Sequence, residues 1–174
     1  MDHADHVNLL RKGIPASGGI WADFGAGGGA FTLALADLIG SEAQIHAIDA
    51  NAATLRTNEL AMRSRFPATS VRYHVADFTA PLDLPPLDGI VIANAVHFQR
   101  DQPAVVALLR GYLKPGGRLL IVEYNIHHPN RAVPFPVPYA RWEVLAQDAG
   151  FTSTELLVTR PSRTFAEIYS AAST

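Results

Sequence analysis

Short apolar runs alternate along this chain with stretches in which apolar residues recur every three or four positions. The runs predict strands at about 20–24, 44–48, 70–75, 88–93 and 117–124. The stretches between them predict helices at about 5–12, 29–39, 51–65, 101–113 and 139–149. Short buried strands separated by helices are typical of βαβ units. The sequence therefore predicts an α/β fold whose mostly parallel sheet is covered by helices on both faces.

The end of the chain departs from this alternation. Residues 152–159 and 164–170 both have the composition of strands, and only residues 160–163 separate them. A connection this short cannot hold a parallel crossover, so we expect an antiparallel hairpin. The Lys-Pro-Gly-Gly run at 114–117 predicts the end of a helix and a turn into the next strand. Since no repeat or interdomain linker is visible, we expect residues 1–174 to form a single domain.

A glycine-rich turn at 25–29 follows the first predicted strand and precedes a helical pattern. Glycines let the backbone approach a ligand closely, and a helix N-terminus offers free N–H groups to an anionic group. The spacing of Gly25, Gly27 and Ala30 fits the loose dinucleotide-binding pattern, with the acid Asp49 ending the next strand. The loop also fits a second pattern, Asp23-x-Gly25-x-Gly27-x-Gly29, and these residues alone leave both interpretations open.

Four further segments follow the glycine turn in a fixed order. With the turn they form the set Asp23–Gly29, Ile45–Ala50, His74–Phe78, Leu87–His97 and Leu113–Glu123. In sequence, order and spacing this set resembles the class I S-adenosylmethionine-dependent methyltransferases, and the resemblance covers nearly the whole chain. It implies a Rossmann-like three-layer sandwich with a seven-stranded sheet that ends in an antiparallel hairpin. It also implies S-adenosyl-L-methionine as cofactor and S-adenosyl-L-homocysteine as product.

The resemblance implies contacts with the cofactor in the first four of these five motifs. The glycine-loop N–H groups would face its carboxylate, and Asp23 would attract its ammonium. Asp49 would accept from the ribose hydroxyls and Asp77 from the adenine amine, although aspartates at such places also cap turns. Asn94 would border the methionine part and the transferable methyl. The complete implied set is Asp23, Phe24, Gly25, Ala26, Gly27, Gly29, Asp49, Ala50, Asp77, Phe78 and Asn94.

Histidines mark the acceptor side of the predicted site. His97 follows the fourth strand, where loops at the carboxyl end bind ligands, and it is the candidate catalytic base. Packing over the cofactor and binding of a product group are the alternatives. His127 and His128 follow the fifth strand, but adjacent histidines point in different directions and no carboxylate has a matching spacing. We therefore expect no metal.

Other segments are expected to shape the site or to support it. The resemblance makes the N-terminal helix, about 1–13, a lid, and the proline-rich stretch of about 125–142 a substrate-side loop. Two residues outside these segments, Asp88 and His46, are expected to be structural, with His46 a satisfied residue of the core or edge. The aromatic residues expected on the acceptor side are Tyr124, Phe135, Tyr139 and Trp142, with a core position as the alternative for Trp142.

The composition narrows the class of function. The chain has no cysteine, which excludes disulfides and thiolate metal sites and is compatible with a reducing cytoplasm, the location we expect. The net charge of -2 provides no basic surplus for nucleic acid, and residues 94–97 lack the Asn/Asp-Pro-Pro-aromatic motif of DNA amino-methyltransferases. No apolar run approaches the ~20 residues of a membrane span. We therefore expect methyl transfer to a small-molecule acceptor. The alternatives are a non-catalytic S-adenosylmethionine-binding protein and, third, an NAD-dependent oxidoreductase.

Overall fold

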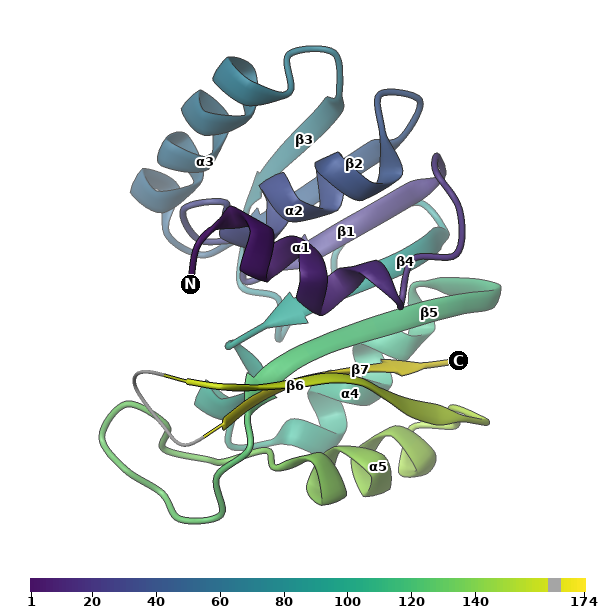
Figure 1. Ribbon diagram of the computed structural model, residues 1–174. Helices are drawn as coiled ribbons and strands as arrows, with labels where there is room; N and C mark the ends of the chain where they lie inside the picture. The colour runs from purple at the N-terminus through teal and green to yellow at the C-terminus, as the bar shows by residue number, and fades with distance from the viewer. Residues whose placement is uncertain (163–166) are drawn as a thin grey trace.

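The computed structural model describes residues 1–162 and 167–174 and contains a seven-stranded sheet (Figure 1). The strand order is β3-β2-β1-β4-β5-β7-β6. The first five strands run parallel, whereas β7 runs antiparallel to both β5 and β6. The strands are β1 (Ile20–Phe24), β2 (Gln44–Asp49), β3 (Ser70–Val75), β4 (Leu87–Ala93), β5 (Leu113–Tyr124), β6 (Thr154–Pro161) and β7 (Glu167–Ser173).

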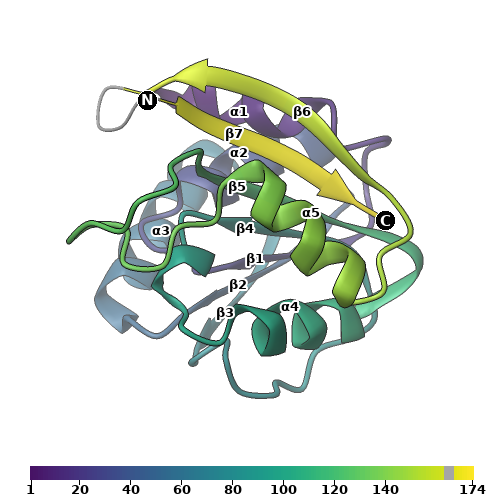
Figure 2. The same cartoon turned by 90° about the horizontal axis from the view of Figure 1, so that it is seen from below.

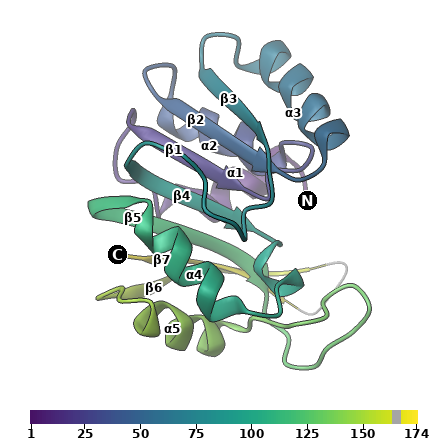
Figure 3. The same ribbon diagram turned by 180° about the vertical axis from the view of Figure 1, so that it is seen from behind.

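Helices cover both faces of the sheet (Figures 2 and 3). On one face lie α1 (His3–Arg11), α2 (Ala30–Ile39) and α3 (Ala52–Arg65), and on the other lie α4 (Gln102–Gly111) and α5 (Tyr139–Asp148). Alternate residues of each central strand point to opposite faces of the sheet. In β1, Trp21 belongs to the core cluster on the face covered by α1 and α2, and Phe24 belongs to the cluster on the face covered by α4 and α5. Burial on both faces explains why the strands read as continuous apolar runs. The predicted three-layer α/β sandwich is confirmed.

Local signals place most helix ends. Asn51 caps α3, where its Oδ1 accepts hydrogen bonds from the N–H groups of Ala53 at 2.9 Å and Thr54 at 3.3 Å. Asp101 caps α4 in the same way through the N–H of Ala104, at 3.2 Å. Each of the five predicted helices is present, with ends within two residues of the expected positions. A short 3₁₀ helix, η1 (Val96–Phe98), was not predicted.

The structure differs from the sequence prediction at the α4–β5 connection and in the bounds of the hairpin. Helix α4 ends at Gly111, and β5 begins at Leu113 rather than at 117. The reason is that Leu113 of β5 pairs with Leu87 of β4. The register then shifts, so that Gly89 lies opposite Arg118. The Lys-Pro-Gly-Gly run is therefore a bulge inside a strand. The hairpin is confirmed, but β6 and β7 lie two to three residues nearer the C-terminus than predicted. Residues 164–166 of the predicted second strand are outside the described part of the chain.

The topology brings the candidate residues to one edge of the sheet. From β1 the chain builds β2 and β3 on one side, then returns to place β4 and β5 on the other. Ligands of open parallel sheets bind at such a reversal, beyond the carboxyl ends of the strands. Here that place lies where β1 meets β4, with Asp23 and Asn94 on the two sides. No helix in the part of the chain that the structure describes is long and apolar enough to cross a membrane.

A candidate cofactor site at the reversal of strand order

The glycine loop is held against the end of β2. The N–H groups of Gly25 and Ala26 donate to the carbonyl of Ile48 at 2.9 and 3.0 Å. Gly25, with φ 73°, has no room for a side chain, because a Cβ there would lie 2.8 Å from the Cβ of Ala95. Gly27, with φ 48°, differs: the nearest atoms to a Cβ would be 3.9 Å away, so it borders open space. The N–H groups of Gly25 and Ala26 thus fix the loop on β2, and Gly27 has no side chain to obstruct a ligand that approaches the loop.

Gly29 has a structural role in the packing of α2 against α3. It precedes α2 with φ 94°, and a Cβ there would lie 2.7 Å from the side chain of Asn58 in α3. This glycine lets α3 pack closely on the start of α2. Its implied place in the cofactor set remains a prediction, and the contact supplies a structural reason for the same residue.

Asp23 lies at the bottom of the site. Its residue is 1% exposed, the Thr32 hydroxyl donates to its Oδ2 at 2.6 Å, and the Asn58 amide in turn donates to Thr32 at 2.8 Å. Burial raises the pKa of Asp23 to about 7, against the lowering effect of the Thr32 hydrogen bond, and the nearby Asp49 carboxylate raises it further. Without a cationic partner, this carboxyl therefore exchanges its proton near neutral pH.

The other two acids lie along the same edge and hold turns. Asp49 Oδ2 accepts from the Gly27 N–H at 2.8 Å, and its Oδ1 accepts from the Asn51 N–H at 2.8 Å. Asp77 Oδ1 accepts from both the N–H and the hydroxyl of Thr79, at 2.9 and 2.8 Å, and these bonds lower the pKa of Asp77. Both acids thus cap turns, which was the alternative to cofactor binding in the sequence analysis. Asp49 also links the glycine loop to the end of β2.

A cavity of about 450 Å³ brings several predicted residues together. Phe24 does not line it with its side chain, which is fully buried and stacks on Tyr112 at 5.8 Å between ring centroids. The predicted residues that are not part of its wall are Gly27, Gly29, Asp49, Ala50, Asp77, Phe78 and His97. The wall consists of Met1, His6, Asp23, Gly25, Ala26, Gly28, Ala30, Phe31, Leu33, Ala93 and Asn94.

Asn94 has the clearest features of a ligand-binding residue. It is the one non-glycine residue with positive φ, 51°, in the described chain, and strain of this kind persists at ligand sites. Its Oδ1 is buried and has no hydrogen-bond partner among the described residues. A buried acceptor without a donor is costly. The ammonium of an amino-acid ligand would supply that donor, so Asp23 and Asn94 both fit the amino-acid end of S-adenosylmethionine.

The N-terminal segment borders the cavity through Met1 and through His6 of α1, and its role as a lid stays a prediction. The His6 ring packs edge-on against Phe31 with centroids 4.9 Å apart, and burial lowers the pKa of His6. His6 and Met1 were not predicted to contact the cavity. The only sequence signal for them was the amphipathic pattern of the N-terminal helix.

His97 is linked to a residue that the sequence analysis missed. Glu123, at the end of β5, lies 2.6 Å from the His97 Nδ1 through its Oε2. Its Oε1 accepts from the N–H groups of Val96 and His97 at 3.0 and 3.2 Å. Both residues are at most 2% exposed. Glu123 thus holds the imidazole and the first turn of η1 together, and a charged residue in the apolar run of β5 was the available signal.

The other residues singled out in the sequence are mainly structural. Trp142 is fully buried in the core, and Asp88 is structural because it accepts from Ile20 N–H at 2.7 Å and from Lys114 at 2.8 Å. The expectation that His46 is satisfied was wrong for one nitrogen: its Nδ1 pairs with His74 at 2.9 Å, but its buried Nε2 has no partner among the described residues. Within the same residues, no group of three metal-binding side chains is present.

Comparisons with known proteins agree with this geometry. A family model described as "Methyltransferase domain" matches residues 22–119. A ubiquinone/menaquinone biosynthesis C-methyltransferase, UbiE, of a Marinomonas species is 29% identical over 118 residues, which cover 67% of this chain and 47% of the relative. Its counterpart in Idiomarina loihiensis is 32% identical over 104 residues, 59% of this chain and 41% of the relative. The chain spans about half the length of these curated relatives.

Solved structures share the fold. YcgJ of Bacillus subtilis superimposes with a TM-score of 0.78 at 13% identity, over 98% of both chains. A phosphoethanolamine N-methyltransferase of Haemonchus contortus, solved with S-adenosylhomocysteine, gives 0.80 at 16% identity, over 98% of this chain and 52% of the other. A SAM-dependent methyltransferase of Aquifex aeolicus gives 0.73 at 15% identity, over 99% and 98%. The glycine loop, the sheet order and these matches together show that the chain belongs to the methyltransferase-domain family, within the class I S-adenosylmethionine-dependent methyltransferases.

Proposed function

We propose that the protein transfers the methyl group of S-adenosylmethionine to a small-molecule acceptor. The observation that carries the proposal is that Asp23 and the unpartnered Oδ1 of Asn94 lie in one cavity, beside the N-terminus of α2, whose first N–H groups have no partner within the helix. The curated relatives are named as C-methyltransferases of quinone biosynthesis. Their names support transfer to an organic molecule, and the low identity leaves the acceptor of this chain to experiment.

We propose the following division of roles. Asp23 and Asn94 bind the ammonium of the cofactor, and the loop N–H groups bind its carboxylate. Asp49 accepts hydrogen bonds from the ribose hydroxyls. Because its Oδ2 already accepts from the Gly27 N–H, that oxygen must either accept a second hydrogen bond or give up the first. Asp77 accepts from the adenine amine. The backbone of Phe24 and Gly29, and the surfaces of Ala26, Ala50 and Phe78, complete the binding set.

The residues of this chain act mainly by alignment. When bound, S-adenosylmethionine would supply a methyl group on a sulfonium: a lone pair or carbanion of the acceptor would bond to the methyl carbon as the carbon–sulfur bond opposite it breaks, and S-adenosylhomocysteine would leave as a neutral thioether. Because the leaving thioether needs no protonation, positioning and exclusion of water account for most of the rate. Helix α1 is placed to contribute to that exclusion, since its His6 lines the cavity and packs against Phe31 of α2.

We propose His97 as the base for an acceptor that keeps its proton until late in the reaction. The Glu123 carboxylate next to Nδ1 favours the tautomer with a proton there, which leaves Nε2 as the proton acceptor. The competing role is structural, because the same pair anchors η1. Glu123→Gln separates the roles: its amide can donate to Nδ1, which moves the imidazole proton to Nε2 while η1 keeps its acceptor.

A base predicts that Glu123→Gln and His97→Ala both lower turnover at least ~10-fold, with unchanged affinity for S-adenosylhomocysteine. A purely structural pair predicts normal turnover in Glu123→Gln and a lowered unfolding free energy in His97→Ala. The general test of function is release of S-adenosylhomocysteine with a panel of small acceptors. Cofactor binding without release for any acceptor would favour the non-catalytic alternative.

Two broader proposals complete this account. We propose that residues 1–174 form one domain, supported by the membership of β1 to β7 in one sheet. We also propose a cytoplasmic location, supported by the absence of cysteine from the sequence. Fractionation of the native host with an antibody to the chain tests the location.

A further inference from the structure

Three buried polar residues form a row behind the cofactor cavity, from β1 through α2 to α3. They are Asp23, Thr32 and Asn58. We propose that Thr32 and Asn58 are positioning residues for the cofactor: together they favour the charged form of the Asp23 carboxyl and leave one of its oxygens for the ammonium of S-adenosylmethionine. The inference rests on the proposed function and adds two residues through which the ammonium contact is set.

The hydrogen bonds of the row all point toward Asp23. The Asn58 amide donates to the Thr32 oxygen at 2.8 Å, and the Thr32 hydroxyl donates to Asp23 Oδ2 at 2.6 Å. Because the amide occupies a lone pair of the threonine oxygen, the hydroxyl proton is left for the carboxylate. A hydroxyl in a helix often donates to a carbonyl of the preceding turn, but Thr32 donates across to β1 instead. Donors directed at a carboxylate favour its charged form.

The row divides the two oxygens of Asp23 between the protein and the ligand. Oδ2 accepts from Thr32, whereas Oδ1 has no hydrogen-bond partner among the described residues. Asp23 lines the cofactor cavity together with Asn94, whose own Oδ1 is the unpartnered acceptor described above. An ammonium has three N–H donors. It can therefore bind the Oδ1 atoms of Asp23 and Asn94 without displacing the Thr32 hydroxyl.

The surroundings of Asn58 indicate a role beyond packing. Its side chain is fully buried, and its Oδ1 has no hydrogen-bond partner within the described chain. Gly29 makes room for this side chain, since a Cβ there would lie 2.7 Å from it. A buried oxygen without a donor is unfavourable for the fold, and an apolar side chain of similar size would avoid that cost. The bond to Thr32 is therefore the better explanation of an amide at this position.

The electrostatic surroundings of Asp23 oppose its charged form. Burial raises the pKa of Asp23 to about 7, and the Asp49 carboxylate at the end of β2 raises it further. Of the groups that act on this carboxyl, Thr32 is the one that lowers its pKa. Before the cofactor ammonium arrives, the row is thus the main support of the carboxylate.

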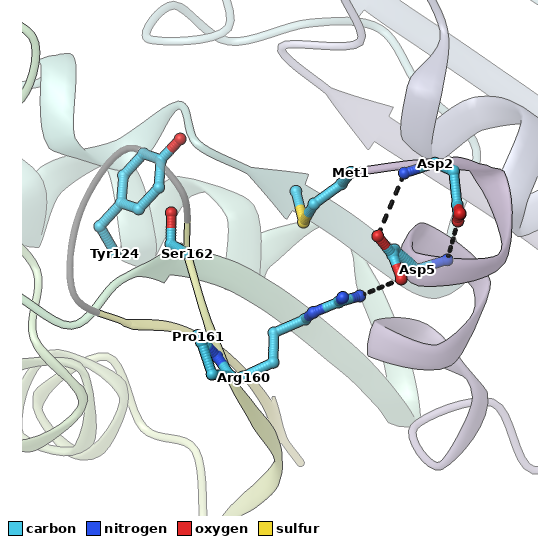
Figure 4. Close-up of a pocket in the computed structure, with 7 residues that line it drawn as sticks. All are labelled: Met1, Asp2, Asp5, Tyr124, Arg160, Pro161 and Ser162. Atoms are coloured by element: carbon cyan, nitrogen blue, oxygen red, sulfur yellow. Dashed lines mark hydrogen bonds and ion pairs between the residues drawn. The ribbon is translucent and has the colours of Figure 1, made fainter.

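The other titratable side chain on the wall of the cofactor cavity, within the described residues, is His6 of α1. A close-up of the neighbouring cavity shows how this helix is held: Arg160 of β6 extends across to Asp5 of α1 and pairs with it (Figure 4). These contacts lie outside the row. Changes at Thr32 or Asn58 should therefore leave the position and the titration of His6 as they are in the wild type.

The pH dependence of S-adenosylhomocysteine affinity tests the row, by calorimetry of the whole chain at pH 6 and pH 8. Titration of Asp23 alone should make the wild-type affinity ~10-fold higher at pH 8, because this carboxyl is mostly protonated at pH 6 without ligand. Thr32→Val keeps the shape of the side chain and removes the hydroxyl, which should raise the pKa of Asp23 by about one unit. Its affinity should then lie ~5-fold or more below wild type at pH 6, and ~2-fold or less below it at pH 8.

Further variants separate positioning from packing. Thr32→Ser keeps the hydroxyl and loses a methyl group, so it should show the wild-type pH dependence. Asn58→Leu removes the donor to Thr32 and should lower the affinity at pH 6 by ~2-fold or more, with a smaller effect at pH 8. Because Asn58 acts through the hydroxyl, adding Asn58→Leu to Thr32→Val should change the affinity no further. The control is Thr57→Val, the same change on the exposed surface of α3, which should leave the affinity unchanged at both pH values.

The outcomes distinguish this inference from the proposed function. If the wild type binds no S-adenosylhomocysteine at either pH, the proposed function itself is wrong. Normal wild-type binding, with the same pH dependence in Thr32→Val, would overturn the role of the row. An equal loss of affinity at both pH values, shared by Thr32→Ser, would show a packing role and overturn it as well.

A further loss on adding Asn58→Leu to Thr32→Val would contradict the action of Asn58 through the hydroxyl. Urea unfolding checks that each variant is folded. Should Thr32→Val be unfolded, Asn58→Leu decides by the same criterion: a loss confined to pH 6 supports the row, and an equal loss at both pH values, or no loss, overturns it.

Discussion

Replacing Asp23 with Asn should stabilise the protein and weaken its hold on the cofactor. The folded state raises the pKa of this carboxyl from 3.8 to about 7, mainly through burial. Between these values the folded chain keeps a proton that the unfolded chain has released. The contribution of Asp23 to the unfolding free energy is therefore highest below about pH 4, falls as the pH rises toward 7, and stays level above. A shift of about 3 units corresponds to about 4 kcal/mol.

Asn carries no charge at any pH and can still accept from the Thr32 hydroxyl. Asp23→Asn should therefore raise the unfolding free energy by about 4 kcal/mol at pH 8 and by about 1.5 kcal/mol at pH 5. The same change removes the negative charge opposite the cofactor ammonium, so S-adenosylhomocysteine affinity should fall ~10-fold or more. In the wild type near pH 6.5, cofactor binding should release a proton, because an ammonium partner lowers the pKa of Asp23.

Urea unfolding at the two pH values measures the stability change, and calorimetry in two buffers of different ionisation enthalpy measures affinity and proton release. The control is Asp148→Asn, which changes an exposed acid at the end of α5. It should leave the unfolding free energy and the S-adenosylhomocysteine affinity nearly unchanged. An equal stability gain at pH 5 and pH 8 would refute the raised pKa. Unchanged S-adenosylhomocysteine affinity would refute the role of Asp23 in ammonium binding.

Three further changes test separate parts of the account. Gly29→Ala should cost about 2 kcal/mol or more in urea unfolding, because its Cβ would lie 2.7 Å from Asn58 at a positive φ, whereas Gly28→Ala, with open space around it, should cost little. Asp49→Ala should weaken S-adenosylhomocysteine binding by about 1–3 kcal/mol in calorimetry, and unchanged affinity would exclude the ribose contact. Burial lowers the pKa of His46 to about 4, so between about pH 6.5 and 4 the unfolded chain binds a proton that the folded chain does not. The contribution of His46 to the unfolding free energy should therefore fall by about 3 kcal/mol as the pH drops through this range. His46→Leu should reduce this fall, and an identical pH profile would contradict it.

The sequence was sufficient for features that depend on local patterns. The apolar runs located β1 to β4, and the caps Asn51 and Asp101 located two helix starts, because each signal lies within a few residues of the structure it specifies. The bulge in β5 was not visible, because the pairing of Leu113 with Leu87 depends on a contact 26 positions away.

The site was predictable in part for the same reason. The motif residues Asp23, Gly25 and Asn94 do meet in one cavity, since the strand order alone brings their strand ends together. The contact of Glu123 with His97 joins the ends of two strands and depends on which way each side chain turns. The positive φ of Asn94 likewise follows from its surroundings rather than from a local turn signal.

Calorimetric titration of the purified chain with S-adenosylhomocysteine, in parallel with NADH, tests the central claim most directly. The account predicts binding of S-adenosylhomocysteine with a dissociation constant of about 100 µM or tighter, and no heat from NADH at the same concentrations. Binding of NADH, or no binding of S-adenosylhomocysteine at millimolar concentration, would contradict it.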